Sequence, residues 1–283
     1  MTETISALLA QARKDLFDAD IELSALDARL LMQAASGLTH EELIAEPETI
    51  LPADQITKFK NFIDRRLSHE PVTRILGERE FYGRSFKVSP AVLDPRADTE
   101  TIIELVLHLI GEQPIRLLDL GTGSGAIAVT LLAERKNWSG IAVDLSSAAL
   151  EIARANAMAV GVSDRLRFHN GTWFEGIFEA FDLIVSNPPY IPHRDIFELS
   201  LEVQNFDPHL ALDGGGDGLK AYRAIAAGAA HRLKPNGKVI LEIGAGQSDE
   251  VIEIFKAQGF HLTGQKHDLG GHLRALAFAL DHL

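Results

Sequence analysis

The sequence predicts an α/β protein with a doubly wound, mostly parallel sheet, preceded by a small all-helical domain. Three observations predict this fold. Apolar residues recur at helical spacing up to about residue 75, where Gly37 is the only glycine. Beyond Pro114, short apolar runs alternate with helical segments, and a glycine-rich turn joins the first run to the first helix. Such alternation is typical of a parallel sheet covered by helices.

Composition restricts the possible functions. The 283 residues carry a net charge of −13, and the parts before and after residue 75 are both acidic, which argues against broad phosphate binding. The absence of cysteine excludes disulfides, thiolate metal sites and cysteine nucleophiles. The eleven histidines show no zinc-ligand spacing. No apolar run approaches membrane-spanning length, so we expect a cytoplasmic protein without membrane or direct nucleic-acid contacts.

The helical domain is expected to cover residues 1–75. Apolar residues at helical spacing predict helices over 5–16 and 23–32, and Leu51-Pro52 opens another that runs to Leu67. Thr39 followed by Glu42 is a candidate capping box. The domain serves either packing and oligomerisation or the recognition of a partner, and its residues alone leave both open.

A β-hairpin is expected to link this domain to the next. Residues 79–88 alternate in character around Gly83, which is typical of two short strands. We therefore assign 76–94 to a linker and 95–283 to the α/β domain. A helix follows over 102–109, with Asp98 or Thr99 as its candidate cap.

Six segments of the α/β domain have strand character, and helices are expected between them, at 126–135 and 148–160 for example. The strand segments are 115–120, 139–144, 166–169, 181–186, 237–243 and 276–279.

The first strand leads into a glycine-rich turn. Its residues are Asp119, Leu120, Gly121, Thr122, Gly123, Ser124 and Gly125. Glycines let the backbone approach a ligand, and the N–H groups at a helix start favour anionic or polar atoms. Asp144 ends the next strand, 19 residues beyond Gly125, where an acidic residue can accept hydrogen bonds from a ribose. The alternative for Asp144 is a helix cap, with Ser146 as a competitor.

The segment Asn187-Pro188-Pro189-Tyr190 follows the strand candidate 181–186. The two prolines end the strand, and Pro188 keeps Asn187 extended, so a carboxamide is displayed at the strand end. Ligands of open α/β sheets bind outside the carboxyl ends of the strands. Taken alone, the segment is more typical of a strand-ending turn than of a binding site.

Asp119-x-Gly121-x-Gly123-x-Gly125 followed by Asp144 resembles the S-adenosylmethionine-dependent methyltransferases, and the Asn187–Tyr190 segment resembles their amino-methylating branch. With Phe81, the stretch 94–100 and the helical N-terminus, the whole chain resembles the release-factor glutamine methyltransferases of the PrmC/HemK family. The resemblance implies a seven-stranded Rossmann-like methyltransferase sheet.

The resemblance also implies site residues for the cofactor. The glycine turn meets the methionine part of S-adenosylmethionine, Asp144 binds the ribose, and Trp173 packs on the adenine or, alternatively, in the core. The expected cofactor residues are Asp119, Gly121, Thr122, Gly123, Ser124, Gly125, Asp144, Trp173 and Asn187. In relatives an acidic residue often precedes the aromatic one, whereas this chain has Thr172 there.

The resemblance also implies how the substrate that receives the methyl group is held. The Asn187 side-chain oxygen and the Pro188 carbonyl oxygen accept hydrogen bonds from the two N–H groups of a glutamine amide. Tyr190 flanks the planar amide, so the expected catalytic residues are Asn187, Pro188 and Tyr190, and Pro189 joins them in binding substrate. The implied substrate is the glutamine of the Gly-Gly-Gln motif in peptide chain release factors, with N5-methylglutamine and S-adenosylhomocysteine as products. The helical domain would dock this protein substrate, and we expect a monomer.

Three further assignments belong to this prediction. The stretch 207–214 resembles a family loop near the active site. Arg96 is expected to pair with Asp98 or Glu100, and the alternative is that it steers the substrate. In the family an apolar residue usually precedes Pro95, where this chain has Asp94.

Related chemistry leaves other functions open. The same segment occurs in enzymes that methylate exocyclic nitrogens of DNA bases, which must flip a base and hold a phosphate backbone. The acidic charge disfavours that substrate. Another protein's glutamine, or a cofactor-binding role without catalysis, are the remaining alternatives.

Overall fold

The computed structural model describes residues 3–280 and divides into two compact units. The first contains the chain up to Glu78 together with Ser200–Phe206. The second contains Arg79–Leu199 and the chain from Asp207 onward. The chain therefore passes between the units three times.

The first unit is all-helical, as predicted. Its helices are α1 (Ile5–Asp18), α2 (Ser24–Ser36), α3 (His40–Ala45), α4 (Ala53–Leu67), α5 (Val72–Leu76) and α9 (Leu201–Phe206). Their apolar faces bury Leu16, Leu31 and Phe59 in one core. The capping box is confirmed, because the Thr39 hydroxyl accepts from the Glu42 N–H and Glu42 accepts from the Thr39 N–H.

A buried ion network fixes α9 within this unit. The Arg66 guanidinium lies 2.7 Å from Asp27 Oδ2 and also donates to Glu202 on α9. Arg66 and Asp27 are both buried, and burial of charges is tolerable only where they are paired. Glu202 thus belongs to the network that holds the helical core together.

The predicted β-hairpin consists of β1 (Glu78–Phe81) and β2 (Arg84–Lys87), and all of it except Glu78 belongs to the second unit. A seven-stranded sheet follows in the order β5-β4-β3-β6-β7-β9-β8. Its strands are β3 (Arg116–Leu120), β4 (Ser139–Asp144), β5 (Leu166–Asn170), β6 (Phe181–Ser186), β7 (Leu233–Glu242), β8 (Phe260–His267) and β9 (Leu273–Leu280). The first five in that order are parallel, and β9 runs antiparallel to both β7 and β8. The predicted fold class is confirmed.

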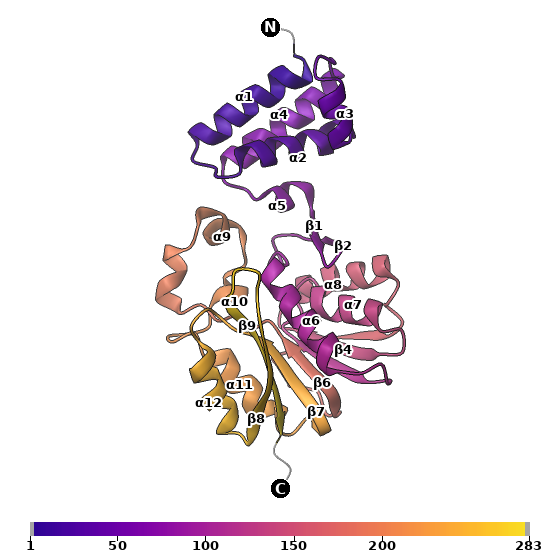
Figure 1. Cartoon of the computed structure of the whole chain (residues 1–283), viewed down its shortest axis with the longest axis vertical. Coiled ribbons are helices and arrows are strands. Elements are labelled where there is room, and N and C mark those ends of the chain that lie inside the picture. Colours follow the sequence, from indigo (N-terminus) through magenta and orange to yellow (C-terminus); the bar gives the residue numbers. More distant parts are fainter. Residues whose placement is uncertain (1–2, 281–283) are drawn as a thin grey trace. The chain divides into compact units, whose positions relative to one another are not determined.

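Helices cover both faces of this sheet (Figure 1). On one face lie α6 (Glu100–Leu109), α7 (Ala126–Glu134) and α8 (Ser147–Val160), and on the other lie α11 (Lys220–Ala229) and α12 (Ser248–Lys256). Short helical turns complete the unit: η1 (Ala97–Thr99), η2 (His193–Glu198) and α10 (His209–Leu212). Leu117 and Leu118 on β3 pack into opposite layers, because successive strand residues point to opposite faces.

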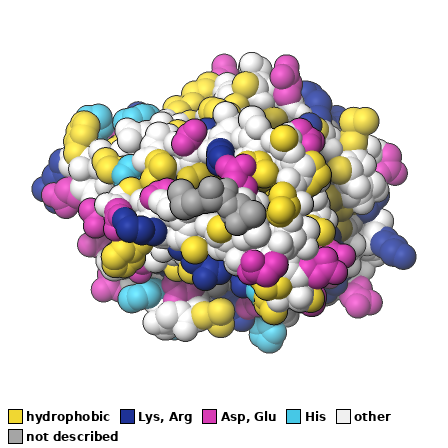
Figure 2. Space-filling view, turned by 90° about the horizontal axis from the view of Figure 1, so that it is seen from above, with side chains coloured by type: hydrophobic (Ala, Val, Ile, Leu, Met, Phe, Trp, Pro, Cys, Tyr) yellow, Lys and Arg dark blue, Asp and Glu magenta, His cyan; other side chains and the backbone are white. Residues whose placement is uncertain are grey.

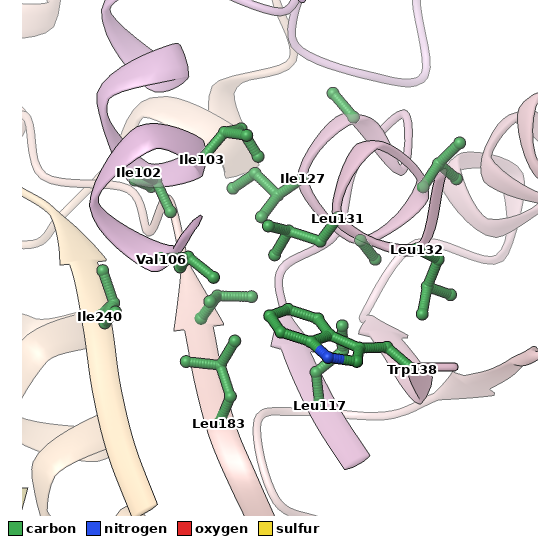
Figure 3. Close-up of a cluster of buried hydrophobic side chains, with 14 of the residues drawn as sticks. Ile102, Ile103, Val106, Leu117, Ile127, Leu131, Leu132, Trp138, Leu183 and Ile240 are labelled. Atoms are coloured by element: carbon green, nitrogen blue, oxygen red, sulfur yellow. The ribbon is translucent and has the colours of Figure 1, made fainter. Parts of the chain in front are cut away.

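Figure 3 shows the α6–α7 layer of this core. Trp138 is fully buried among Leu117 and Leu183 of the sheet and side chains of α7. Its indole N–H donates to the Gln113 carbonyl at 3.0 Å, so the ring is buried without an unpaired polar group. This layer makes the parallel strands β3 and β6 a rigid base for the loops that follow them.

Two local expectations differ from the structure. The strand β8 has no counterpart among the six predicted segments, because it lies at the sheet edge, most of its residues are at least partly exposed, and its register shifts near Gly264. Neither proposed cap of α6 acts as one: Thr99 holds the N-cap position without a side-chain cap, and Asp98 pairs with Arg274 at 3.0 Å. The Thr99 hydroxyl has other partners, described below.

The surface carries mixed charges. Figure 2 shows Lys and Arg side chains interspersed with Asp and Glu over the face in view. Within residues 3–280, no helix has the length and apolar character needed to cross a membrane, and no three acidic or histidine side chains group as metal ligands.

Candidate active site

The predicted motifs converge at the carboxyl edge of the sheet. The strand β3 pairs with β4 on one side and β6 on the other, so the glycine turn, Asp144 and Asn187 follow three neighbouring parallel strands. The Ser186 hydroxyl donates to the Leu120 carbonyl at 2.6 Å and ties the ends of β6 and β3 together. A cavity of about 550 Å³ opens there, within the second unit. Its volume falls in the range of small-molecule sites.

The glycine turn presents bare backbone to this cavity. Gly121, Gly123 and Gly125 all have positive φ, which side-chain-bearing residues rarely adopt. At Gly123 a Cβ would meet no atom within 4 Å, so the space beside it is open. At Gly125 a Cβ would come within 3.2 Å of the Ala153 Cβ on α8, so this glycine serves close packing. Thr122 and Ser124 also line the cavity.

Asp119 lies beneath the turn. Its Oδ2 accepts from the Thr122 hydroxyl at 2.6 Å and from the Ala128 N–H at 3.3 Å. Its Oδ1 has no hydrogen-bond partner among the described residues, and burial raises the pKa of this carboxyl to about 7. Asp119 is not among the residues that form the cavity wall. It therefore shapes the turn, and its predicted direct contact to the cofactor stays a prediction.

Asp144 lines the cavity and braces the turn. Its carboxylate accepts from the Gly123 N–H and from the Ser146 N–H, each at 2.8 Å. The helix α8 is capped by Ser146, whose hydroxyl accepts from the Ala149 N–H, so the capping alternative for Asp144 is wrong. Burial raises the pKa of Asp144, although these backbone donors oppose the shift.

Trp173 lies at the boundary between the protein core and the cavity. Its side chain is half-buried against the second core layer, and it also lines the cavity beside Thr172. Its φ of 51° lies in the left-handed region, where a bulky residue is strained. Strain of this kind persists where the surrounding structure imposes it, often at ligand sites.

Asn187 and Pro189 line the cavity, whereas Pro188 is buried and Pro188 and Tyr190 are not part of its wall. The Asn187 side-chain nitrogen donates to the Thr99 hydroxyl oxygen at 3.0 Å. The Thr99 hydroxyl in turn donates to Glu242 Oε2 at 2.6 Å. The Tyr190 hydroxyl lies 3.4 Å from Glu242 Oε1, at the limit of a hydrogen bond.

Sequence reasoning missed Thr99 as a site residue and missed Glu242 altogether. The available signal for Glu242 was a single carboxylate at the end of the apolar run 239–243, where a buried charge needs a partner. Glu242 is 1% exposed, and burial raises its pKa to about 7. Burial also raises the pKa of Tyr190 far above its usual value, so its hydroxyl keeps its proton.

The loop after β6 closes one side of the cavity. Pro208, Leu210 and Asp213 line it, and Ile191 pairs with Asp213 in a parallel bridge. Arg96 pairs with Asp207 at 2.5 Å, so the expectation that it pairs with Asp98 or Glu100 is wrong. The ion pair joins the segment before α6 to the first residue of the stretch 207–214.

Comparisons with known proteins agree with this geometry. A family model described as PrmC N-terminal domain matches residues 7–77, and one described as Methyltransferase small domain matches residues 96–203. Fold, cavity and family model define a Rossmann-like methyltransferase whose methyl donor is S-adenosylmethionine. More particularly, the chain belongs to the release factor glutamine methyltransferase family. The predicted family is confirmed.

Three relatives carry that assignment, and each is named release factor glutamine methyltransferase. The protein of Bradyrhizobium diazoefficiens is 46% identical over 92% of this chain and 89% of its own length. That of Cereibacter sphaeroides is 45% identical over 93% of both chains, and that of Agrobacterium fabrum is 43% identical over 97% of both.

Solved structures show the same fold at low identity. The catalytic domain of hMettl16, in complex with a MAT2A 3'UTR hairpin, has a TM-score of 0.59 at 20% identity over 75% of this chain and 82% of that one. A methyltransferase from Pyrococcus furiosus has a TM-score of 0.53 at 19% identity over 77% and 98%. At this identity the likeness extends to the fold alone.

Proposed function

We propose that this chain transfers the methyl group of S-adenosylmethionine to the side-chain amide nitrogen of the glutamine in the Gly-Gly-Gln motif of peptide chain release factors. The single observation that carries the proposal is the orientation of Asn187 at the cavity wall. Its amide nitrogen is bound to Thr99, which directs its carbonyl oxygen away from that partner. Because an amide N–H needs an acceptor, this oxygen suits a substrate that is itself an amide.

The residues of the cavity fit the methyl donor. The open backbone at Gly123 and the carboxylate of Asp144 lie together in its wall. The positive end of a helix suits a carboxylate, and Asp144 suits a ribose diol. Trp173 offers a ring face for the adenine. When bound, S-adenosylmethionine supplies an electrophilic methyl group on a sulfonium sulfur.

The protein's contribution to the transfer is alignment. The lone pair of a carboxamide nitrogen is delocalised into its carbonyl, so the nitrogen attacks only when that lone pair is aimed at the methyl carbon. The Asn187 oxygen and the Pro188 carbonyl accept the two N–H bonds of the substrate and set this direction. Positioning and preorganised acceptors each contribute several kcal/mol to catalysis.

The segment after Asn187 completes the acceptor site. Pro188 and Pro189 fix the backbone, and Tyr190 flanks the planar amide while its hydroxyl points to Glu242. No strong base is required, because an amide that has been methylated on nitrogen while still carrying its proton is very acidic and loses that proton to water.

For the remaining parts of the chain, we assign residues 1–75 to docking of the release factor, 76–94 to the linker and 95–283 to methyl transfer. The protein would act as a monomer in the cytoplasm. Docking predicts a higher kcat/KM for an intact release factor than for a Gly-Gly-Gln peptide, and equal values would argue against it.

One experiment tests the function directly. The purified chain is incubated with isotopically labelled S-adenosylmethionine and, in separate reactions, a release factor, the same factor with the motif glutamine changed to alanine, and DNA. We expect label on the first substrate alone, located on the glutamine side chain by mass spectrometry. Label on DNA, or on the alanine variant, would refute the assignment.

A further inference from the structure

We propose that Glu242, acting through Thr99, is a positioning residue that fixes which way the Asn187 carboxamide faces. The inference deepens the proposed function and rests on it. The three side chains come from distant parts of the sequence: the turn before α6, the loop after β6 and the end of β7. They form one continuous chain of hydrogen bonds.

The direction of these bonds follows from counting protons. A threonine hydroxyl has one proton, and an ionised carboxylate can only accept. The 2.6 Å contact to Glu242 takes the Thr99 proton, so the Thr99 oxygen can only accept from its other neighbour. The group of Asn187 that faces Thr99 must therefore be the nitrogen. A flipped amide would place two acceptors against each other.

The fixed orientation matters because the two ends of an asparagine amide do opposite things. With the nitrogen held by Thr99, the oxygen remains to accept an N–H of the substrate. In the flipped orientation Asn187 would offer a donor to a substrate nitrogen that also carries only donors. The carboxylate of Glu242 thus selects the productive state of a side chain that it does not contact.

The same carboxylate reaches the other end of the acceptor site. Its second oxygen lies 3.4 Å from the Tyr190 hydroxyl, and Gln247 donates to the Tyr190 carbonyl at 2.9 Å. Glu242 thus connects to Asn187 through Thr99 and to Tyr190 directly. Burying the Glu242 carboxylate costs free energy of desolvation. Its role in orienting Asn187 accounts for a carboxylate at this buried position.

Protonation of Glu242 should release this selection. A neutral carboxyl can donate to Thr99, which frees the Thr99 proton for the Asn187 oxygen and makes the flipped amide accessible. The groups facing Glu242 are Thr99 and Asp98 before α6, Tyr190 after β6, Tyr222 on α11 and Arg274 on β9. Arg274 favours the charged form, while Asp98 and burial oppose it, and the raised pKa of about 7 lies within an accessible range.

The test compares two substitutions of buried threonines by valine. Thr99→Val removes the hydroxyl that connects Glu242 to Asn187. Thr130→Val on α7 is the matched control, because Thr130 is also fully buried and its hydroxyl has no hydrogen-bond partner among the described residues. We expect Thr99→Val to lower kcat by about 10- to 100-fold relative to the control, with the S-adenosylhomocysteine Kd unchanged within about twofold.

Rescue and pH dependence separate positioning from simple destabilisation. Thr99→Ser restores the hydroxyl and should recover most of the lost kcat. In the unsubstituted chain, kcat should fall as pH drops below about 7, and Glu242→Gln, which removes the ionisable group, should abolish that dependence. An unfolded Glu242→Gln would be recognised by its loss of S-adenosylhomocysteine binding. In that case the kcat values of Thr99→Val, Thr99→Ser and Thr130→Val decide the test.

Two results would overturn the inference: a kcat of Thr99→Val equal to that of Thr130→Val, or an unchanged pH dependence in a folded Glu242→Gln. Either is distinguishable from failure of the proposed function, in which the unsubstituted chain would not methylate the release factor.

Discussion

The two halves of the cavity are positioned by different means. On the cofactor side, the glycine turn and Asp144 follow the adjacent strands β3 and β4, and the Gly123 N–H donates to the Asp144 carboxylate 21 positions further on. On the acceptor side, Asn187 is oriented by side chains 88 and 55 positions away, Thr99 and Glu242. One pair of neighbouring parallel strands is enough to bring the glycine turn and Asp144 together, whereas the orientation of Asn187 requires side chains from two further parts of the fold. A substitution on the acceptor side should therefore leave cofactor binding unchanged. A substitution on the cofactor side should leave the orientation of Asn187 unchanged.

The largest expected effect separates the two halves. Asn187→Ala should lower kcat by about 100-fold or more, because it removes an acceptor that acts mainly in the transition state. Binding of S-adenosylhomocysteine, measured by calorimetry, should stay within about threefold. A turnover close to that of the unsubstituted chain would show that Asn187 does not align the acceptor.

A change on the opposite side should give the reverse pattern. Asp144→Ala should weaken S-adenosylmethionine binding by about 10- to 100-fold, the cost of losing charged hydrogen bonds. The kcat at saturating cofactor should fall much less. Steady-state kinetics with varied cofactor would check this, and a pure kcat effect with unchanged KM would contradict the ribose assignment.

Packing of the turn can be tested apart from ligand binding. Gly125→Ala should lower the free energy of unfolding by about 1–2 kcal/mol, because the residue has φ of 82° and its Cβ would press on Ala153. Gly161→Ala is the control: its φ of 77° carries the same backbone strain, but a Cβ there meets nothing within 4 Å. Urea unfolding should show a larger loss at Gly125, and equal losses would remove close packing as the reason for that glycine.

The last prediction concerns the pH dependence of stability at Asp119, beneath the cofactor side alone. Burial raises the pKa of its carboxyl to about 7 from an ordinary 3.8, so the folded state holds this proton more tightly than the unfolded state. The stabilising contribution is complete below about pH 4 and is lost as pH rises through about 7. Asp119→Asn should flatten the stability profile between these values in urea titrations. A profile identical to that of the unsubstituted chain would show that this carboxyl does not titrate there.

The sequence predicts the fold, and it predicts that the glycine turn and Asp144 meet at one edge of the sheet, for the same physical reason. Strand alternation, the glycine turn and Asp144 are local patterns, and adjacent parallel strands then bring them to one edge. Thr99 was interpretable only as a helix cap, because its contact with Asn187 spans 88 residues. The pairing of Arg96 with Asp207, and the edge strand β8, likewise depend on long-range placement.

The short helix α9 has a practical consequence for dissecting the molecule. Cleaving the chain between Glu78 and Arg79 would not free the helical unit, because Ser200–Phe206 belongs to that unit and would stay on the other fragment. The Arg66–Glu202 ion pair would then join two separate fragments. An excised N-terminal piece would leave Arg66 without one of its two carboxylates, and a piece meant to fold by itself should carry α9 grafted after residue 78.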